Sequence, residues 1–263
     1  MRVRLTFEVQ NRGGVVPFHH QSYLSQIFDS IIVKLSSNFQ DYTFYCFSGL
    51  KGQTRLGKGG LKYSSKRVTV VITSANAEFI EDLIKQLLKA KGFQVGDLII
   101  VPLSADEELP LGFSQEMKYL CISPIIPSLS HPDEIDPTSN EFSDLLYDAT
   151  LNRMVDFGLD LSKIENIQKF QIIPDADYLA RLKASNKVFS RVYTIVDKKE
   201  QELQLRGYTF PFRLFAMPEI QDFIYTCGLG LQCASGYGML DGTNGQSINS
   251  TSPLLNRESV LLA

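Results

Sequence analysis

The spacing of hydrophobic residues changes along the first half of the chain from that of a strand to that of a helix and back. Residues 2–10 alternate between polar and apolar side chains, which is typical of a half-buried strand. From residue 23 to residue 35 the apolar side chains recur at intervals of three and four, and this pattern predicts an amphipathic helix. A second helix is predicted over 79–88, and further strands at 42–48, 67–73, about 93–103 and 117–126. This order of strands and helices is the ferredoxin-like pattern.

The second half of the chain is less regular. It predicts a helix over about 138–158, a short helix over 218–227, and strands near 168–173, 188–197 and 203–217. Prolines at 124, 127, 132 and 137 mark a boundary near the middle of the chain. We therefore expect domains at 1–127 and 128–242, and a flexible tail over 243–263, where Asn, Ser, Thr and Gly are frequent.

The composition is that of a globular protein. The 263 residues are 44% hydrophobic and 21% charged, with a net charge of −3. No apolar run reaches the roughly 20 residues that span a bilayer, and the N-terminus lacks the pattern of a signal peptide. We therefore expect a cytoplasmic protein that does not enter a membrane. The four cysteines are scattered, and with only three histidines they predict no metal site; no cofactor is expected either.

One segment departs from the acidic balance of the chain. Residues 51–67 contain six cationic side chains and no acidic one: Lys51, Arg55, Lys58, Lys62, Lys66 and Arg67. A positive loop on an acidic protein steers polyanions such as RNA toward one face. The same composition also fits a solvated, glycine-rich hairpin without a partner, and the sequence leaves both interpretations open.

A glycine-rich segment links the last predicted helix to a final strand. Its glycines form two pairs, Gly228 with Gly230 and Gly236 with Gly238, around a five-residue insert. The segment is not a Walker loop, because no Lys-Ser or Lys-Thr follows it. Nor is it a dinucleotide fingerprint, which runs from strand to helix. A plain turn needs one or two glycines, so four of them favour a functional loop.

Three segments together carry a resemblance to a known family. Residues 228–239 resemble the C-terminal glycine-rich loop of the CRISPR repeat-processing endoribonucleases, within the repeat-associated RNA-binding superfamily. Residues 16–25 resemble that family's entry to its first helix, and residues 42–52 resemble its second strand. The resemblance implies an α+β fold of two tandem ferredoxin-like domains with a C-terminal glycine-rich loop. It also implies a bound CRISPR repeat RNA and metal-independent cleavage of precursor RNA in antiviral defence.

The cleavage implied by this resemblance begins when a 2′-hydroxyl attacks the adjacent phosphate, and it leaves 2′,3′-cyclic phosphate and 5′-hydroxyl ends. Such a reaction needs a base, an acid and a cation near the phosphate. His20 and His19, at the start of the first helix, are the candidates for proton transfer, and Lys51 is the candidate cation. Many family members carry a histidine after the first helix, where this chain has Ser36 and Ser37.

RNA contacts are predicted in two places. Phosphate positioning is assigned to the basic segment (Arg55, Lys58, Lys62, Lys66 and Arg67), and close backbone contact to the loop glycines (Gly228, Gly230, Gly236 and Gly238). The sequence leaves open whether Tyr63 and Tyr237 stack on unpaired bases or lie in the core. His131, among the prolines, is expected to be an exposed loop residue.

Three functions compete at this stage. The chain is a repeat-cleaving endoribonuclease, or a non-catalytic repeat-RNA-binding relative or subunit of a CRISPR effector complex, or a metabolic or ligand-binding protein on a ferredoxin-like fold. Serine in place of the expected histidine favours the second, whereas His19 and His20 leave room for the first. The sequence shows no paired-carboxylate, metal or nucleotide motif that would support the third. It also leaves open whether two copies form a homodimer.

Overall fold

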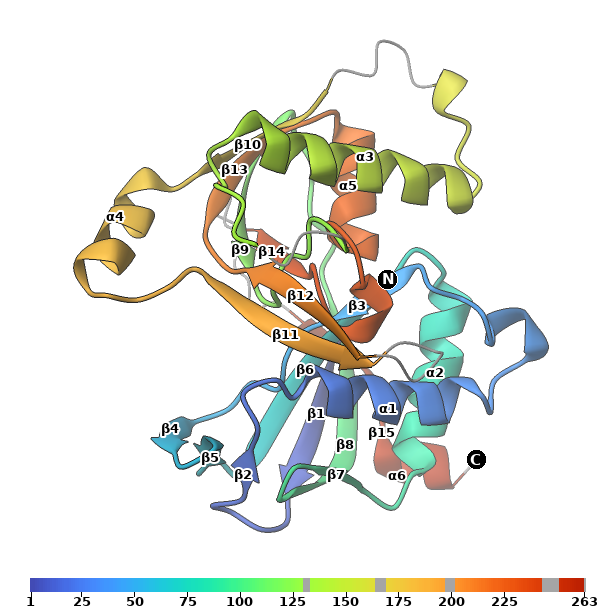
Figure 1. Cartoon of the computed structure of the whole chain (residues 1–263). Coiled ribbons are helices and arrows are strands. Elements are labelled where there is room, and N and C mark those ends of the chain that lie inside the picture. The colour runs from blue at the N-terminus through green and yellow to red at the C-terminus, as the bar shows by residue number, and fades with distance from the viewer. Residues whose placement is uncertain (130–132, 164–168, 197–201, 243–250, 263) are drawn as a thin grey trace. The chain divides into compact units, whose positions relative to one another are not determined.

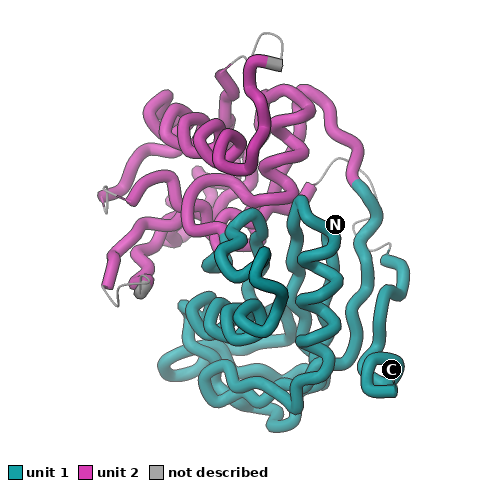
Figure 2. Tube along the Cα trace, turned by 90° about the vertical axis from the view of Figure 1, so that its right-hand side faces the viewer, with its two compact units in different colours: residues 1–110, 234–236, 249–263 teal, residues 111–233, 237–248 magenta. Residues whose placement is uncertain are grey.

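The chain divides into two compact units (Figure 1, Figure 2). The computed structural model describes residues 1–129, 133–163, 169–196, 202–242 and 251–262. Unit 1 comprises Met1–Pro110, Ala234–Gly236 and Asn249–Ala263, and unit 2 comprises Leu111–Cys233 and Tyr237–Ile248.

Unit 1 is built on an antiparallel sheet with a ferredoxin-like order of strands. Its main elements along the chain are β1 (Arg2–Val9), α1 (Gln21–Ile32), β3 (Tyr45–Phe47), β6 (Arg67–Ser74), α2 (Ala77–Lys89) and β8 (Leu98–Glu108). The strands lie side by side in the order β8-β1-β6-β3, and every neighbouring pair is antiparallel. The fourth strand thus lies beside the first, then the third, then the second, which confirms the ferredoxin-like prediction for this half.

One face of this sheet forms the core of unit 1 with the two helices. The inward side chains of β1 are the ones that its alternation predicts, and each is at most 7% exposed: Val3, Leu5, Phe7 and Val9. They belong to one hydrophobic cluster with the apolar stripes of α1 and α2, which include Phe28 and Leu83. The inward side chains of the strand and the apolar side chains of the two helices therefore pack, as expected, in one core.

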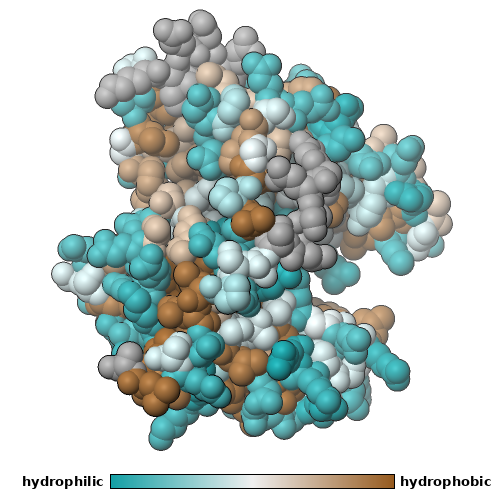
Figure 3. Space-filling view, turned by 180° about the vertical axis from the view of Figure 1, so that it is seen from behind, coloured by the Kyte–Doolittle hydropathy of each residue, from teal (hydrophilic) through white to brown (hydrophobic). Residues whose placement is uncertain are grey.

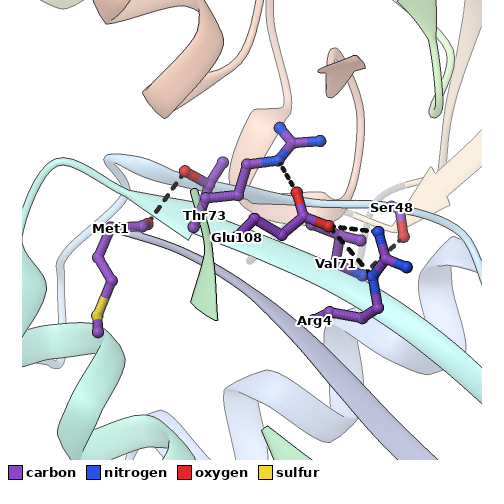
Figure 4. A network of polar contacts seen from close by, with 7 residues as sticks. Met1, Arg4, Ser48, Val71, Thr73 and Glu108 are labelled. Atoms are coloured by element: carbon purple, nitrogen blue, oxygen red, sulfur yellow. Dashed lines mark hydrogen bonds and ion pairs between the residues drawn. The ribbon is translucent and has the colours of Figure 1, made fainter. Parts of the chain in front are cut away.

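The opposite face of β1 carries an ion network (Figure 4). Glu108, at the end of β8, accepts a hydrogen bond from Arg2 Nε at 2.6 Å and another from Arg4 Nη2 at 2.8 Å. Burial alone would raise the pKa of the Glu108 carboxyl, but the two guanidinium groups outweigh burial and lower that pKa. The network joins the first strand of the sheet to the fourth.

The C-terminal segment differs from its prediction. Residues expected to form a flexible tail instead form β15 (Thr251–Asn256), which pairs with β8, and α6 (Arg257–Leu261), whose Val260 lies in the core of unit 1. The flexible-tail prediction is therefore wrong for 251–262, while 243–250 and 263 lie outside the described residues. An edge strand pairs through its backbone, and the mixed sequence of β15, TSPLLN, has no alternation that would indicate a strand.

Unit 1 also carries smaller elements. A three-stranded sheet, in the order β2-β5-β4, consists of β2 (Val15–Val16), β4 (Thr54–Gly57) and β5 (Gly60–Tyr63). The short strand β7 (Phe93–Val95) forms a hairpin with β8, and a 3-10 turn, η1 (Ser37–Phe39), lies between α1 and β3.

Unit 2 repeats the ferredoxin-like connectivity. Its main elements are β9 (Glu116–Cys121), α3 (Asn140–Asp156), β10 (Gln171–Pro174), β13 (Phe212–Phe215), α5 (Pro218–Cys227) and β14 (Leu240–Gly242). The sheet is antiparallel with the order β10-β13-β9-β14, again second, third, first and fourth. Tyr119 of β9 is buried on the side of α5, where its hydroxyl donates to Gln221 Oε1 at 2.9 Å. The chain therefore contains two ferredoxin-like units in tandem.

An insertion lies between β10 and β13 of unit 2. It contains α4 (Ala176–Ala184) and a hairpin of β11 (Ser190–Val196) and β12 (Glu202–Tyr208). The strand predicted over 203–217 is therefore two strands, β12 and β13, and α4 is absent from the prediction. Two 3-10 turns also occur in this half of the chain: η2 (Leu161–Lys163) follows α3, and η3 (Cys233–Ser235) follows α5.

The boundary between the units differs from the predicted position at 127. Unit 1 reaches Pro110 before the chain enters unit 2. Strand β9 lies within the predicted first domain, 1–127, but it pairs with β13 and β14 of unit 2. Hydrophobic alternation indicates which face of a strand is buried but not which sheet the strand joins, and this is why the boundary was misplaced.

The longest helix of the described ranges, α3, has 17 residues. None of the helices described there combines the length and the apolar character needed to cross a membrane. Hydrophobic residues interrupt the polar surface at scattered places (Figure 3), as is ordinary for folded proteins.

Candidate functional site

Most of the basic segment is folded into the small sheet of β2, β5 and β4, which we call the basic sheet. Arg55 and Lys62 face each other across β4 and β5, and both are exposed. Lys58, also exposed, lies in the tight turn between these strands. Like charges directly opposite each other destabilise a strand pair. The pairing of Arg55 with Lys62 therefore places two like charges side by side, and their repulsion does not stabilise the hairpin.

Arg12 joins this surface, although no sequence pattern linked it to the basic segment. The N–H of Gly13 donates to the carbonyl of Tyr63 at 2.7 Å. The side chain of Lys62 packs so closely on Gly13 that a Cβ there would lie 3.1 Å from Lys62 Cε. The pairing of β2 with β5 thus brings Arg12, which is exposed, to the edge of the basic sheet.

Lys66 and Arg67 lie beyond the basic sheet, where β6 begins, and both are exposed. The carbonyl of Lys66 accepts a hydrogen bond from the N–H of Val9 at 2.9 Å. Arg67 is the cross-strand partner of Glu8, and opposite charges at such positions attract each other. Of the five residues predicted to position phosphates, Arg67 is therefore the least suited to that role.

Lys51 projects from a rigid part of unit 1. Its N–H donates to the carbonyl of Thr69 at 2.8 Å, and the N–H of Thr69 donates back to its carbonyl at 2.9 Å. The residue itself is exposed. Two backbone hydrogen bonds therefore hold this predicted catalytic cation at an exposed position of unit 1.

His20 occupies a position that does not suit the predicted proton transfer. It is 7% exposed, and its two ring nitrogens contact the carbonyl of Pro17 at 3.1 Å and the N–H of Leu50 at 3.0 Å. Burial lowers its pKa, the bond to Pro17 raises it, and the neighbouring His19 lowers it, with a net lowering. A general base needs a nitrogen within reach of the substrate. In this geometry both nitrogens are already engaged inside unit 1.

His19 has the exposure that His20 lacks. Its carbonyl accepts a hydrogen bond from Ser22 Oγ at 3.3 Å at the entry to α1, and the residue is exposed. Ser36 and Ser37, in the place where the resemblance led us to expect a histidine, are exposed at the start of the turn η1. His131 lies outside the described residues. Of the two histidines predicted to transfer protons, His19 is therefore the one accessible to a substrate.

The glycine-rich loop, residues 228–238, packs tightly between α5 and β14. All four of its paired glycines are buried. Gly238 has a φ of +72°, and a Cβ there would lie 2.1 Å from the carbonyl oxygen of Leu229. At Gly230 a Cβ would lie 2.5 Å from the carbonyl oxygen of Ile126. These glycines therefore permit close backbone packing within unit 2, and their contact with RNA stays a prediction.

The other two loop glycines also lie against protein. Gly228 ends α5, and its N–H donates to the carbonyl of Ile224 at 2.8 Å. Gly236 belongs to unit 1, where a Cβ would lie 2.4 Å from the ring of Phe47. Gly236 therefore has no room for a larger side chain, and Gly228 has a φ of +88°, which other residues rarely adopt.

Arg153 of α3 supplies a cation that the loop's own sequence lacks. Its guanidinium donates to the carbonyls of Cys227 at 2.6 Å, Gly228 at 2.7 Å and Gly230 at 3.3 Å. It also lies over the ring of Phe223, 5.7 Å from the ring centre. Sequence reasoning missed this residue because a single arginine near the end of a helix has an ordinary place there.

The two tyrosines considered for base stacking are core residues. Tyr63 is 1% exposed, its hydroxyl donates to the carbonyl of Leu50 at 2.7 Å, and burial raises its pKa to about 12. Tyr237 is 3% exposed, and its ring meets that of Tyr193 edge-on. Of the alternatives that the sequence left open, the structure therefore favours the core.

Comparisons with known proteins agree with this fold. A family model described as CRISPR associated protein Cas6, C-terminal, matches residues 106–242. A relative from Methanocaldococcus jannaschii, named CRISPR-associated endoribonuclease Cas6 1, is 23% identical over 260 residues, which cover 91% of this chain and 92% of that protein.

Two solved structures share the fold over nearly the whole chain. The first, described as the characterization of a Cas6-related gene from Pyrococcus furiosus, superposes with a TM-score of 0.76 at 18% identity and covers 94% of this chain and 99% of that one. The second, described as an RAMP protein binding different RNA substrates, has a TM-score of 0.76 at 17% identity and covers 93% of this chain and 100% of that one.

Proposed function

The chain belongs to the Cas6 family of CRISPR-associated proteins, and from this premise we propose that it is an endoribonuclease that cleaves CRISPR precursor RNA at its repeats. The basic sheet is the observation that carries the proposal. Four exposed cations lie on it or at its edge in a chain whose net charge is −3: Arg12, Arg55, Lys58 and Lys62. A local positive surface of this kind attracts the phosphates of RNA and positions them.

The proposed reaction is a transesterification within the RNA. The 2′-oxygen forms a bond to the adjacent phosphorus while the bond from that phosphorus to the 5′-oxygen of the next nucleotide breaks. The 2′-hydroxyl gives its proton to a base, and the leaving 5′-oxygen takes up a proton. The products are a 2′,3′-cyclic phosphate and a 5′-hydroxyl, and the proposed scheme needs no metal ion.

Two side chains of unit 1 are proposed to carry this chemistry. His19 is exposed, and its imidazole is proposed to accept and donate the protons that this scheme requires. Lys51 is a cation on a rigid backbone and is proposed to stabilise the negative charge that develops on the phosphate oxygens.

A second function, repeat-RNA binding without cleavage, is favoured by a separate observation. His20 has both ring nitrogens engaged in the protein, and Ser36 and Ser37 stand where many family members carry a histidine. Proton transfer would then depend on His19, the other histidine in the described part of the chain. If His19 did not transfer the proton, the protein would bind the repeat RNA without cleaving it and hold it for a CRISPR effector complex.

A cleavage assay with the protein's own repeat RNA separates these functions. Wild-type protein is incubated with end-labelled RNA in EDTA, beside His19→Gln and Lys51→Ala, with the exposed Lys89→Ala on α2 as a matched control. We expect one cut with a cyclic-phosphate end, slowed about 10²-fold or more in the first two variants and unchanged in the third. Tight binding without a cut by the wild type would replace the nuclease with the second function. Failure to bind repeat RNA would refute both.

A further inference from the structure

The ring of His20 joins two segments of unit 1 that lie 30 residues apart in the sequence. Its Nδ1 is 3.1 Å from the carbonyl oxygen of Pro17, which can only accept, so Nδ1 must carry a proton. Its Nε2 is 3.0 Å from the backbone nitrogen of Leu50, which can only donate, so Nε2 must be unprotonated. The ring is therefore the neutral Nδ1–H tautomer. A doubly protonated ring would place two N–H groups against each other at Leu50.

The backbone of Leu50 and Lys51, next to the His20 ring, is held by several hydrogen bonds. The N–H of Leu50 donates a hydrogen bond to His20 Nε2. The carbonyl of Leu50 accepts a hydrogen bond from the Tyr63 hydroxyl at 2.7 Å. The next residue, Lys51, exchanges two backbone hydrogen bonds with Thr69. Four hydrogen bonds thus fix the backbone from which the Lys51 side chain projects, and the one from His20 is the link to the entry of α1.

Gly49 lies against the same ring. A Cβ at this position would be 3.0 Å from His20 Nε2 and 3.1 Å from Gln21 Nε2. The ring therefore packs directly on the backbone of the residue before Leu50. This close contact leaves little room for a substrate group to reach Nε2.

We propose that His20 is a positioning residue, which clamps the Leu50–Lys51 backbone to the entry of α1, where His19 lies, and takes no part in proton transfer. The clamp fixes the relative placement of the backbones that carry the two proposed reacting side chains. The kinetic test of this inference rests on the proposed nuclease function, whereas its spectroscopic test does not.

Two substitutions of His20 each keep only one of the ring's two hydrogen bonds. In His20→Gln the side-chain oxygen reaches the place of Nε2 and can accept the N–H of Leu50. In His20→Asn the side-chain amide reaches only the place of Nδ1 and can donate only to Pro17. We expect His20→Gln to restore most of the cleavage that His20→Asn and His20→Ala lose, a loss of about 10²-fold, because misplacing a reacting group by about 1 Å has that effect.

The kinetic readout is kcat beside the Kd for repeat RNA, with thermal unfolding to confirm that each variant folds. A positioning role predicts a lower kcat at an unchanged Kd in His20→Asn, because the basic sheet is untouched. If both variants fold and His20→Gln cleaves RNA as slowly as His20→Ala, His20 itself would take part in proton transfer, and the proposal would fail.

Nitrogen-15 NMR of the imidazole rings tests the clamp without any reaction. With three histidines in the chain, single His→Gln variants assign the signals. We expect His20 at pH 7.5 to show a protonated Nδ1 and an unprotonated Nε2. A cationic ring, or a proton on Nε2, would overturn the clamp. If the wild type does not cut RNA but this signature is present, the nuclease function is refuted while the clamp stands.

Discussion

Removing the three cations of the β4–β5 hairpin should flatten the salt dependence of RNA binding. Arg55, Lys58 and Lys62 are exposed, so their replacement by alanine leaves the core of unit 1 intact. Each cation that neutralises a phosphate contributes about 0.7–0.9 to the slope of log K against log salt, so three contribute roughly 2–3. Between about 50 and 200 mM salt this difference amounts to roughly a 20- to 40-fold smaller loss of affinity in the variant than in the wild type.

Fluorescence anisotropy of labelled repeat RNA over that salt range measures the slope. The matched control replaces Lys85 and Lys89 of α2, and Lys91 just beyond it, by alanine, since these are also exposed and their removal changes the net charge equally. The control should keep the wild-type slope. Equal flattening in both triple variants would mean that net charge, and not the basic sheet, governs binding. An unchanged slope in the hairpin variant would mean that the RNA follows another path.

Three further substitutions test unit 2 and the ion network by urea unfolding. Gly238→Ala should lower the unfolding free energy by at least about 2 kcal/mol, because of its positive φ and the clash with a carbonyl, whereas Gly112→Ala, with open space around it, should have little effect. Arg153→Met should lower it by about 2–4 kcal/mol, since three carbonyls lose a charged donor. A loss below 0.5 kcal/mol would contradict that role. Glu108 has a folded pKa below its ordinary 4.5, so its charge stabilises the fold above that pH and ceases to do so as pH falls through the lower folded value. Glu108→Gln should therefore be less stable than the wild type at pH 7 and lose less stability on acidification, and equal acid profiles would refute this.

The elements that the sequence predicted well are those with a strong pattern of their own. The alternation of β1 and the apolar stripes of α1 and α2 correspond to side chains that meet in one core. Strands β9 and β15 were misplaced or missed for a physical reason. The partner of β9 is decided by register with β13, and β15 is held to β8 through backbone hydrogen bonds. Neither property leaves a periodic signal in the chain.

The candidate site was predictable as a charge pattern but not as a geometry. The run of cations in 51–67 correctly marked an exposed, positive hairpin. Arg12 joins this hairpin through the pairing of β2 with β5. Strand β2 consists of only two valines, so the sequence did not indicate that pairing. The residue type of His20 suggested catalysis, whereas the folded chain brings two backbone groups into contact with its ring nitrogens. Residue type can therefore nominate a catalyst, but hydrogen-bond partners decide whether the group is free to react.

The central claim is that this chain cuts repeat RNA by attack of a 2′-hydroxyl on the neighbouring phosphate. It is tested most directly with a repeat RNA in which the nucleotide before the mapped cut carries a single 2′-deoxy sugar. We predict that wild-type protein in EDTA binds this RNA as tightly as the unmodified one and leaves it intact. Cleavage of the deoxy-substituted RNA at the same place would contradict the account, because the nucleophile would then have to come from elsewhere.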